Sequence, residues 1–326
     1  MPDPAPAAQA AILTITLNPA LDLSSETDRV VPELKLRCSA PLVDPGGGGI
    51  NVSRAIARLG GDSTPLVSVA GHTGARLEDA LRREGLRPAR IPAPGETRQS
   101  LSVTCRETGR QYRFVMPGPA WGRAEVQAAL IAAGEAAQPG GFAVLSGSQP
   151  PGVPDDFPAR LAAALAGHES RLIMDTSGPA LAELVARPTT PAPFVLRMDG
   201  EEARALAGGP LPDLVATGRF AHDLVRRGAA HAVICARGPE GSVMATADGA
   251  VHCPAARVDV VSKVGAGDSF VGAFTLALGR GGSLAEALRH GVAAASAAVM
   301  TAATQLCRPE DVARLLPECT LSDLPV

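Results

Sequence analysis

The stretch Val264-Gly265-Ala266-Gly267-Asp268-Ser269-Phe270 places a glycine-flanked turn directly before an acid and an apolar helical pattern. Apolar positions after it recur at helical spacing, and residues 257–261 before it (Arg-Val-Asp-Val-Val) predict a short strand. A helix that begins at such a turn leaves backbone N–H groups unpaired at its positive end, and glycine lets an anion approach them closely. The stretch therefore predicts an anion site with a carboxylate at its edge, which suits phosphoryl transfer.

Strands and helices alternate along the rest of the chain. Short Val-, Ile- and Leu-rich runs alternate with helical segments, which indicates right-handed βαβ units and a mostly parallel sheet covered on both faces. The predicted strands are 12–17, 66–70, 143–146, 172–175, 195–198 and 232–235, and the predicted helices are 51–59, 75–84, 124–137, 156–166, 179–186, 200–207, 214–227 and 283–302. We expect a single domain over residues 12–317, after a disordered leader (1–11) and before a C-terminal tail (318–326).

Two regions depart from this alternation. Residues 22–43 and 97–117 predict paired strands, and the second region contains a hairpin signal around the turn at 107–110 (Glu-Thr-Gly-Arg). A small antiparallel sheet that leaves a parallel one has an exposed face, so it is a candidate lid, a dimer surface, or both. We expect a homodimer that pairs through this sheet.

Composition limits the partners and the compartment. Of the 326 residues, 46% are hydrophobic and 3% are aromatic, and the formal net charge is −3. This charge favours neither nucleic acid nor an anionic membrane, so local cations and backbone dipoles have to hold any anionic ligand. The six cysteines show no metal-ligand spacing, no basic region marks a secretory signal, and no apolar run is long enough to span a bilayer. We expect reduced thiols and a cytoplasmic location.

A glycine run is the second motif with chemical content. Residues 45–54 (Pro-Gly-Gly-Gly-Gly-Ile-Asn-Val-Ser-Arg) bring bare backbone close to a ligand before a predicted helix, and Asn51 is able to bind a hydroxyl. A flexible turn with Asn51 as the helix N-cap explains the same residues. The run alone leaves both interpretations open.

Four motifs occur in an informative order. They are residues 18–22 (Asn-Pro-Ala-Leu-Asp), the glycine run, residues 146–152 (Ser-Gly-Ser-Gln-Pro-Pro-Gly) and the Gly-Ala-Gly-Asp turn. In this order the chain resembles the ribokinase-like (PfkB) carbohydrate kinases over residues 12–317, most closely the PfkB-type 6-phosphofructokinases. The stretches 35–41, 97–99, 111–118 and 175–178 support the resemblance. It implies a three-layer α/β/α sandwich with a mostly parallel central sheet and a small β lid.

The resemblance also implies a kinase that uses ATP and Mg²⁺ to phosphorylate a ketohexose phosphate. Asp268 corresponds to the catalytic base, and the backbone amides of Gly265, Ala266 and Gly267 correspond to the groups that hold the transferred phosphoryl. The helix N-terminus beside Asp268 predicts a carboxylate that is ionised at neutral pH. The alternative is that Asp268 only caps its helix.

On the sugar side, the resemblance assigns Asp22 to sugar hydroxyls and Arg98 to the phosphate that the substrate already carries. A forked guanidinium suits phosphate, and a net-negative protein needs such a cation. The other implied sugar-site residues are Gly47, Gly48, Asn51, Ser148 and Lys35, with Arg37 and Arg113 as further lid cations. Each lid cation has the alternative of being an ordinary solvated residue, and the Lys35 position is also linked to regulation in the family.

Gly48 bears on the choice of substrate. Ketohexose-1-phosphate kinases and tagatose-6-phosphate kinases of this family carry a lysine there, in a GGKGxN pattern, whereas the 6-phosphofructokinases carry GGGGIN, as this chain does. Loss of the lysine changes where a phosphate is neutralised, so we expect fructose 6-phosphate to be converted to fructose 1,6-bisphosphate. A 1-phosphofructokinase and a tagatose-6-phosphate kinase are the alternatives.

The nucleotide side departs from the family pattern. Relatives carry KPNxxE where this chain has Arg197-Met198-Asp199-Gly200-Glu201-Glu202. Glu202, Asp199 and Asp175 are the implied magnesium residues, although the first two also have capping-box spacing. The other implied nucleotide-site residues are Arg197, Ala236, Gly238, Gly241, Lys263 and Ser296, and Ala303 belongs to a loop implied in K⁺ binding. Several of these positions differ from the usual residue, so the strength of ATP binding and K⁺ activation stay open.

Two classes of function follow from these features. The first is an active sugar-phosphate kinase, and the second is a sugar-phosphate-binding regulatory protein with low activity. The intact turn, Asp268 and Glu202 favour the kinase, because the chemistry needs these parts most.

Overall fold

A ten-stranded sheet forms the centre of the molecule. The computed structural model describes residues 9–302 and 305–326. In spatial order the strands are β14 (Ser322–Leu324), β13 (Gly249–Cys253), β12 (Ser242–Thr246), β11 (Ala232–Ala236), β10 (Val195–Met198), β9 (Arg171–Asp175), β8 (Phe142–Ser146), β1 (Ile12–Thr16), β4 (Thr64–Val69) and β5 (Ala89–Pro92). The strands from β11 to β5 are parallel, and β12, β13 and β14 add an antiparallel edge. Every residue of β1 and β8 is buried, as expected for central parallel strands.

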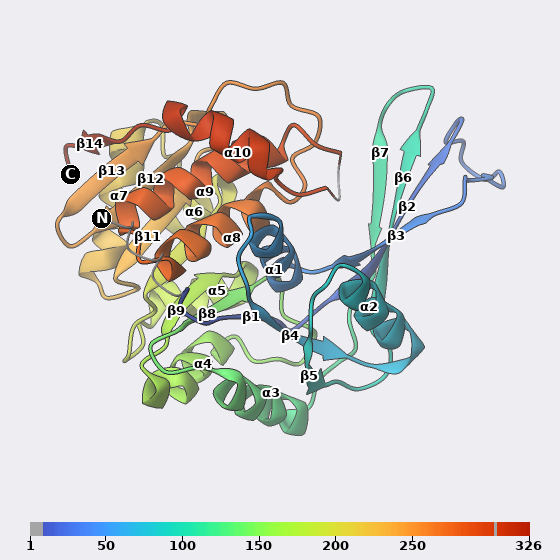
Figure 1. Cartoon of the computed structure of the whole chain (residues 1–326), viewed down its shortest axis with the longest axis horizontal. Coiled ribbons are helices and arrows are strands. Elements are labelled where there is room, and N and C mark those ends of the chain that lie inside the picture. Colours follow the sequence, from blue (N-terminus) through green and yellow to red (C-terminus); the bar gives the residue numbers. More distant parts are fainter. Residues whose placement is uncertain (1–8, 303–304) are drawn as a thin grey trace, which may run out of the picture.

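Helices cover both faces of this sheet (Figure 1). One core cluster is built with α1 (Gly48–Arg58), α8 (Ala266–Gly279), α9 (Leu284–Ala298) and α10 (Pro309–Leu315). The other is built with α3 (Arg123–Ala136), α4 (Phe157–Leu165), α5 (Gly178–Ala186), α6 (Gly200–Ala207) and α7 (Leu214–Arg226). A smaller cluster joins α2 (Gly71–Arg83) to the start of the lid. The predicted three-layer α/β/α sandwich is confirmed.

The lid is a separate four-stranded sheet that projects from the body of the molecule (Figure 1). Its strands, in order, are β3 (Leu42–Gly46), β2 (Ala20–Thr27), β6 (Arg98–Cys105) and β7 (Gln111–Val115). β6 and β7 form the predicted hairpin, but β2 and β6 pair in parallel, so the lid is mixed rather than antiparallel throughout. The parallel pair arises because β2 follows β1 and β6 follows β5, and β1 and β5 run in the same direction.

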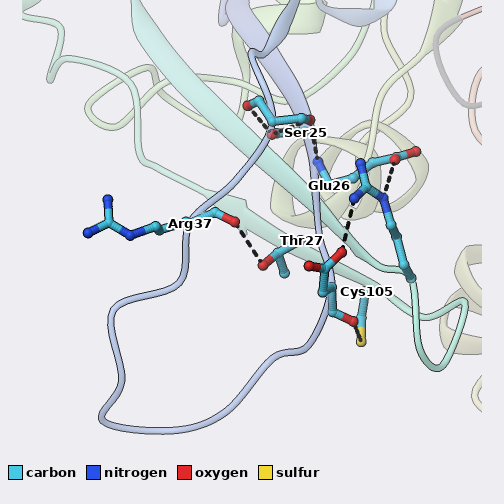
Figure 2. A network of polar contacts seen from close by, with 8 residues as sticks. Ser25, Glu26, Thr27, Arg37 and Cys105 are labelled. Atoms are coloured by element: carbon cyan, nitrogen blue, oxygen red, sulfur yellow. Dashed lines mark hydrogen bonds and ion pairs between the residues drawn. The ribbon is translucent and has the colours of Figure 1, made fainter.

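Hydrogen bonds tie the segment 28–41, between β2 and β3, back to the lid (Figure 2). Ser25 Oγ donates to the carbonyl of Ser39 at 2.7 Å, and Thr27 Oγ1 donates to the carbonyl of Arg37 at 3.1 Å. The side chain of Arg37 turns away from this network. The carbonyls of Ser39 and Arg37 therefore help to hold the loop, while the side chains of Lys35 and Arg37 stay exposed.

The predicted strand at 257–261 is wrong. Val260 and Val261 are 59% and 66% exposed, and the N–H groups of Val261 and Ser262 both donate to the carbonyl of Val299 at the end of α9. The segment therefore bonds to a helix end and pairs with no strand. Its apolar residues resemble those of a strand, but its hydrogen bonds do not.

Both chain ends differ from the expectation. Residues 1–8 lie outside the described residues, but Ala10 donates its N–H to the carbonyl of Gly279 at 2.8 Å, so the end of the expected leader is ordered against α8. In the expected tail, β14 pairs with β13 and extends the central sheet. No helix in the described part of the chain is both long and apolar enough to cross a membrane.

Candidate active site

Asp268 lies in the first turn of α8, three residues after a glycine whose backbone is in the left-handed region of φ and ψ. Gly265 is the N-cap, with φ of 78°, and its carbonyl accepts the N–H of Ser269 at 2.9 Å. The N–H groups of residues 266–268 precede this bond, so they have no partner within the helix at its positive end. No side-chain bond caps α8, and Gly265 takes the cap position. The alternative that Asp268 only caps its helix is therefore wrong.

Asn51 is the direct partner of Asp268. Its Nδ2 donates to Asp268 Oδ2 at 2.9 Å, although 217 positions separate the two residues. Asn51 lies inside α1, whose N-cap is Gly47, so the interpretation of Asn51 as the N-cap is also wrong. The glycine run and the Gly-Ala-Gly-Asp turn thus meet at one pair of side chains.

The environment of Asp268 changes its acidity. Burial raises the pKa of Asp268 to about 7, and the nearby Asp175 carboxylate acts in the same direction. The hydrogen bond from Asn51 and the charges of Arg197 and Arg54 oppose this rise. Burial thus outweighs the helix N-terminus, from which the sequence predicted a carboxylate that is ionised at neutral pH. A carboxyl with this pKa is suited to taking up and releasing a proton near pH 7.

Arg197, at the end of β10, lies beside the anion turn and forms an ion pair with Asp175. Its Nη1 donates to Asp175 Oδ1 at 2.7 Å. Burial opposes the charge of Arg197, but Asp175, and then Asp268 and Glu202, raise its pKa above the ordinary value. A Cβ at Gly267 would lie 3.1 Å from Arg197 Nη1, so the guanidinium lies close against the turn. Arg197 thus supplies positive charge next to the anion site.

The end of β8 lies against the start of α1. Ser146 Oγ donates to Asp175 Oδ2 at 2.9 Å, and the N–H of Gly147 donates to the carbonyl of Asp175 at 3.1 Å. A Cβ at Gly48 would lie 2.7 Å from the nitrogen of Gly147, closer than van der Waals contact. Glycine at position 48 is therefore required by this packing as well as by the sugar-binding role that the resemblance implies.

The predicted sugar-side residues come from the base of the lid. Asp22 lies on β2, and Arg98 begins the neighbouring β6. Burial raises the pKa of Asp22, while Arg98 and Arg113 oppose that rise, so both cations face this carboxyl. Arg98 donates to the carbonyls of Asn18 and Met116 at 3.1–3.3 Å. In the part of the chain that is described, it forms no ion pair, so its charge stays available.

Two further sugar-side residues lie at the surface. Ser148 is exposed in the loop after β8, and its Oγ accepts a hydrogen bond from Asn18 Nδ2 at 3.2 Å. This bond joins two of the sequence motifs across 130 positions. Lys35 is exposed in the loop between β2 and β3. The structure therefore places Ser148 with the other motifs and Lys35 on the outer part of the lid.

Asp199 and Glu202 form the capping box that their spacing predicted. Asp199 Oδ1 accepts the N–H of Glu202 at 2.9 Å, and Glu202 Oε2 accepts the N–H of Asp199 at 2.7 Å. Burial raises the pKa of Glu202, and Asp199 and Asp175 add to the rise although its bond from the Asp199 N–H opposes it. Across residues 9–302 and 305–326, no group of three His, Cys, Asp or Glu side chains is gathered to hold a metal.

These acids fit one kind of magnesium site. Asp175 is committed to Arg197 and Ser146, and Asp199 is committed to the helix cap, so a cage of three carboxylates does not fit. Glu202 uses only Oε2 in the cap. A carboxylate with one oxygen left over fits Mg²⁺ that arrives with ATP phosphates and keeps most of its waters.

The remaining nucleotide-side residues have mixed positions. Ala236 ends β11 and Gly238 begins a short 3-10 turn, after which Gly241 has φ of 94°. Lys263 is exposed just before the anion turn. Ser296 is buried, and its Oγ accepts the N–H of Ala256 at 3.2 Å, which gives it a structural role. Ala303 lies outside the described residues, so nothing is added to the K⁺ expectation.

Sequence reasoning missed Arg54 and its partner Glu84. Arg54 Nη1 donates to Asn51 Oδ1 at 3.3 Å, so Arg54 stands directly behind the Asn51–Asp268 pair. The signal for Arg54 was available, because it follows Asn51 by three positions on a predicted helix and such residues share a face. Glu84 carried no signal, since it reaches Arg54 only through the packing of α2.

The fold and the candidate site agree with the class of carbohydrate kinases, and comparison with known proteins shows that class. The model of the pfkB family carbohydrate kinases matches residues 13–311. The chain is 40% identical over 93% of its length to ATP-dependent 6-phosphofructokinase isozyme 2 of Mycobacterium tuberculosis, covering 88% of that protein. It is 32% identical to the 1-phosphofructokinase of Xanthomonas campestris, with 94% of each chain covered.

A solved structure agrees with these relatives. Phosphofructokinase-2 from Escherichia coli in complex with fructose-6-phosphate superimposes with a TM-score of 0.87 at 37% identity, covering 95% of this chain and 99% of that one. The chain belongs to the pfkB family of carbohydrate kinases.

Proposed function

We propose that this chain is an ATP-dependent kinase that transfers a phosphoryl group to the 1-hydroxyl of fructose 6-phosphate. The product is fructose 1,6-bisphosphate. The observation that carries the proposal is the 2.9 Å hydrogen bond between Asn51 and Asp268 at the N-terminus of α8. It places a proton acceptor beside an anion site, which is the pairing that phosphoryl transfer to an alcohol needs. The names of the relatives support the same reaction class.

Each group has a defined task in this mechanism. Asp268 accepts the proton of the 1-hydroxyl while the hydroxyl oxygen bonds to the γ-phosphorus, and the bond from that phosphorus to the bridging oxygen of ADP breaks. The N–H groups of Gly265, Ala266 and Gly267 stabilise the charge on the transferred phosphoryl oxygens. Arg197 adds a fixed positive charge beside the turn. Asn51 holds Asp268 so that its other oxygen faces the acceptor.

Mg²⁺ belongs to the proposal through ATP. Glu202 would hold it, directly or through water, with Asp199 shaping the position of Glu202 through the capping box. When bound, Mg²⁺ supplies positive charge to the phosphates of ATP. Ala236, Gly238, Gly241 and Lys263 are proposed to border the nucleotide.

The preference for fructose 6-phosphate rests on Gly48 and Arg98. A lysine at position 48, as in the 1-phosphate kinases, would need the end of β8 to move, because even a Cβ there meets the backbone of Gly147 at 2.7 Å. Arg98 forms no ion pair within residues 9–302 and 305–326, so it is the proposed partner of the 6-phosphate. Asp22, Gly47 and Ser148 are proposed to bind the sugar hydroxyls, with Lys35 closing from the lid.

We further propose a homodimer through the lid and a cytoplasmic location. A row of apolar residues crosses the lid in register: Val43 faces Leu23, Leu23 faces Leu101, and Leu101 faces Phe114. Val43 is 38% exposed and Phe114 is 54% exposed, so the row offers apolar surface to a second copy. The six free thiols of the chain support a reducing compartment.

An ADP-release assay with MgATP and a panel of ketohexose phosphates tests the substrate. We expect the highest kcat/KM with fructose 6-phosphate. A higher value with fructose 1-phosphate or tagatose 6-phosphate would replace it with the corresponding alternative. Binding of fructose 6-phosphate without ADP release would instead support the regulatory protein. The same assay in K⁺ and in Na⁺ shows whether K⁺ activates.

A further inference from the structure

Arg54 is a buried cation that the proposed reaction does not use. It lies on α1, and its side chain is only 4% exposed. A charge taken out of water destabilises the folded state unless it is well paired, so the burial of Arg54 calls for a structural partner or a function. Glu84 is the partner: Arg54 Nε and Nη2 donate to its two carboxylate oxygens at 2.7 and 2.8 Å. This forked pair fixes the plane of the guanidinium.

The remaining nitrogen of Arg54 faces the active site. Nη1 donates to Asn51 Oδ1 at 3.3 Å and to the carbonyl of Pro45 at 3.4 Å. A guanidinium has only donors, so it selects the amide oxygen of Asn51 and leaves the amide nitrogen for Asp268. A flipped amide would turn N–H groups toward Arg54 and an oxygen toward the carboxylate of Asp268, and both contacts would be repulsive.

Hydrogen bonds fix the direction of this guanidinium. A cavity of about 520 Å³ opens beside it, lined by Arg54, Glu84 and Asp44 among others. Asp44 Oδ1 lies 3.9 Å from Nη2, too far for a hydrogen bond, and adds only charge. The orientation of Arg54 therefore depends on Glu84 at the end of α2.

We propose that Arg54, fixed by Glu84, is a positioning residue that locks the Asn51 amide in the orientation that donates to Asp268. The inference rests on the proposed function, because Asp268 acts there as the base. Lysine is no substitute for Arg54, since one ammonium cannot form the fork with Glu84 and reach Asn51 in a fixed direction.

The other charged groups around Asp268 do not supply this lock. Asp175 of β9 disfavours the carboxylate, and Arg197 of β10 favours it, but neither contacts Asn51 in the described structure. The donor from Asn51 lowers the pKa of Asp268, and so does the charge of Arg54. A loosened Asn51 therefore leaves Asp268 protonated to a higher pH.

Steady-state kinetics of Arg54→Lys across pH 6–9 test the inference, with Arg58→Lys as the matched control. Arg58 lies one turn further along α1, and within residues 9–302 and 305–326 its side chain donates only to the carbonyl of Leu306, at 3.4 Å. We expect Arg54→Lys to lower kcat at pH 7 by about 10- to 100-fold. We also expect the acid limb of the plot of kcat against pH to move to higher pH. Glu84→Gln is expected to give the same changes in weaker form. An Arg54→Lys profile that coincides with the wild type overturns the inference.

A double-variant cycle separates positioning from general destabilisation. If Arg54 acts through Asn51, adding Arg54→Lys to Asn51→Ala lowers kcat by less than about twofold further. If the kcat of the double variant falls by the product of the two single-variant losses, Arg54 acts independently of Asn51, and the inference is overturned. Where Arg54→Lys fails to fold, Glu84→Gln takes its place in the same cycle, since Glu84 is 32% exposed and its loss is better tolerated.

A measurement of stability against pH tests the same inference without an activity assay. Because the folded-state pKa of Asp268 is raised, the unfolding free energy of the wild type, relative to Asp268→Asn, falls as pH rises and levels off above about 7. When both proteins also carry Arg54→Lys, we expect the pH at which this free-energy difference levels off to rise by about half a pH unit or more. No movement overturns the inference. A wild type that turns over no sugar phosphate overturns the proposed function alone.

Discussion

At the residue scale, Asp268 is set between two opposing influences. Burial and the Asp175 carboxylate disfavour its charge, while the Asn51 donor and the cations Arg197 and Arg54 favour it. A carboxylate in bulk water is too weak a base to take a proton from an alcohol efficiently. A raised pKa makes it a stronger base, because it reduces the difference in pKa between the carboxyl and the alcohol. In the proposed mechanism, burial therefore matches the base to neutral pH, and one neutral donor and two nearby cations keep it ionisable.

The acidity of Asp268 predicts the pH dependence of turnover. The folded-state pKa of about 7 means that the carboxylate form, which is the active base, becomes dominant as pH rises through 7. We expect kcat/KM for fructose 6-phosphate, which reports the free enzyme, to rise about tenfold from pH 6 to pH 8. Initial rates of ADP release at low fructose 6-phosphate concentrations in a buffer series measure it. A kcat/KM that is flat between pH 6 and 8 would contradict the assignment.

At the scale of elements, the site is the place where two loop-to-helix junctions meet. The start of α1 and the start of α8 approach each other, so the two glycine-rich motifs share one space although they are far apart in the sequence. Gly48 is where α1 approaches the end of β8 most tightly. Packing and the proposed sugar binding therefore involve the same glycine.

Substitution of Gly48 tests this junction. A Cβ at Gly48 would lie 2.7 Å from the backbone of both Ser146 and Gly147. We expect Gly48→Ala to lower the unfolding free energy by about 1–3 kcal/mol and to raise the KM for the sugar, because the start of α1 has to shift. Gly134→Ala in α3 is the matched control, since its Cβ would meet nothing closer than 3.9 Å. Denaturant melts and sugar KM values measure the pair; a Gly48→Ala protein that behaves like the control would show that the approach is not needed.

At the scale of the whole molecule, the lid projects from the body and carries exposed apolar residues. Its register aligns Val43, Leu23, Leu101 and Phe114 across all four strands. Aligned apolar rows on a half-exposed sheet are typical of a surface that another sheet covers. The lid also carries Arg98 and Asp22 at its base, so we expect the proposed dimer to influence the proposed sugar site.

A charged substitution in this apolar row of the lid tests the proposed homodimer. We expect the wild type at micromolar concentration to have the mass of a dimer, and Phe114→Glu to have the mass of a monomer, because the charge would be buried in the interface. Ile131→Glu is the control, since Ile131 is 51% exposed on α3, away from the lid. Light scattering after gel filtration measures the masses. A monomeric wild type, or a dimer that survives Phe114→Glu, would rule out this interface.

The sequence predicted the fold well where local pattern and burial agree. The buried run at residues 143–146 and the helical pattern at 200–207 both match elements of the structure. The prediction of a strand at 257–261 was wrong, because the segment has apolar residues but, in the described structure, no neighbouring strand to which it bonds. The contacts that define the site were beyond local reasoning, since Glu84 lies 30 positions from Arg54 and acts through tertiary packing. The raised pKa of Asp268 was missed for the same reason, because burial is a property of the whole fold.

The turnover of Asp268→Asn tests the central claim most directly. The substitution keeps the size of the side chain and an oxygen that accepts from Asn51, but it removes the base and its charge. We expect kcat for ADP release with fructose 6-phosphate to fall by about three orders of magnitude or more, while fructose 6-phosphate still binds with an affinity within a few-fold of the wild type. A variant that turns over at close to the wild-type rate would contradict the assignment of Asp268 as the catalytic base.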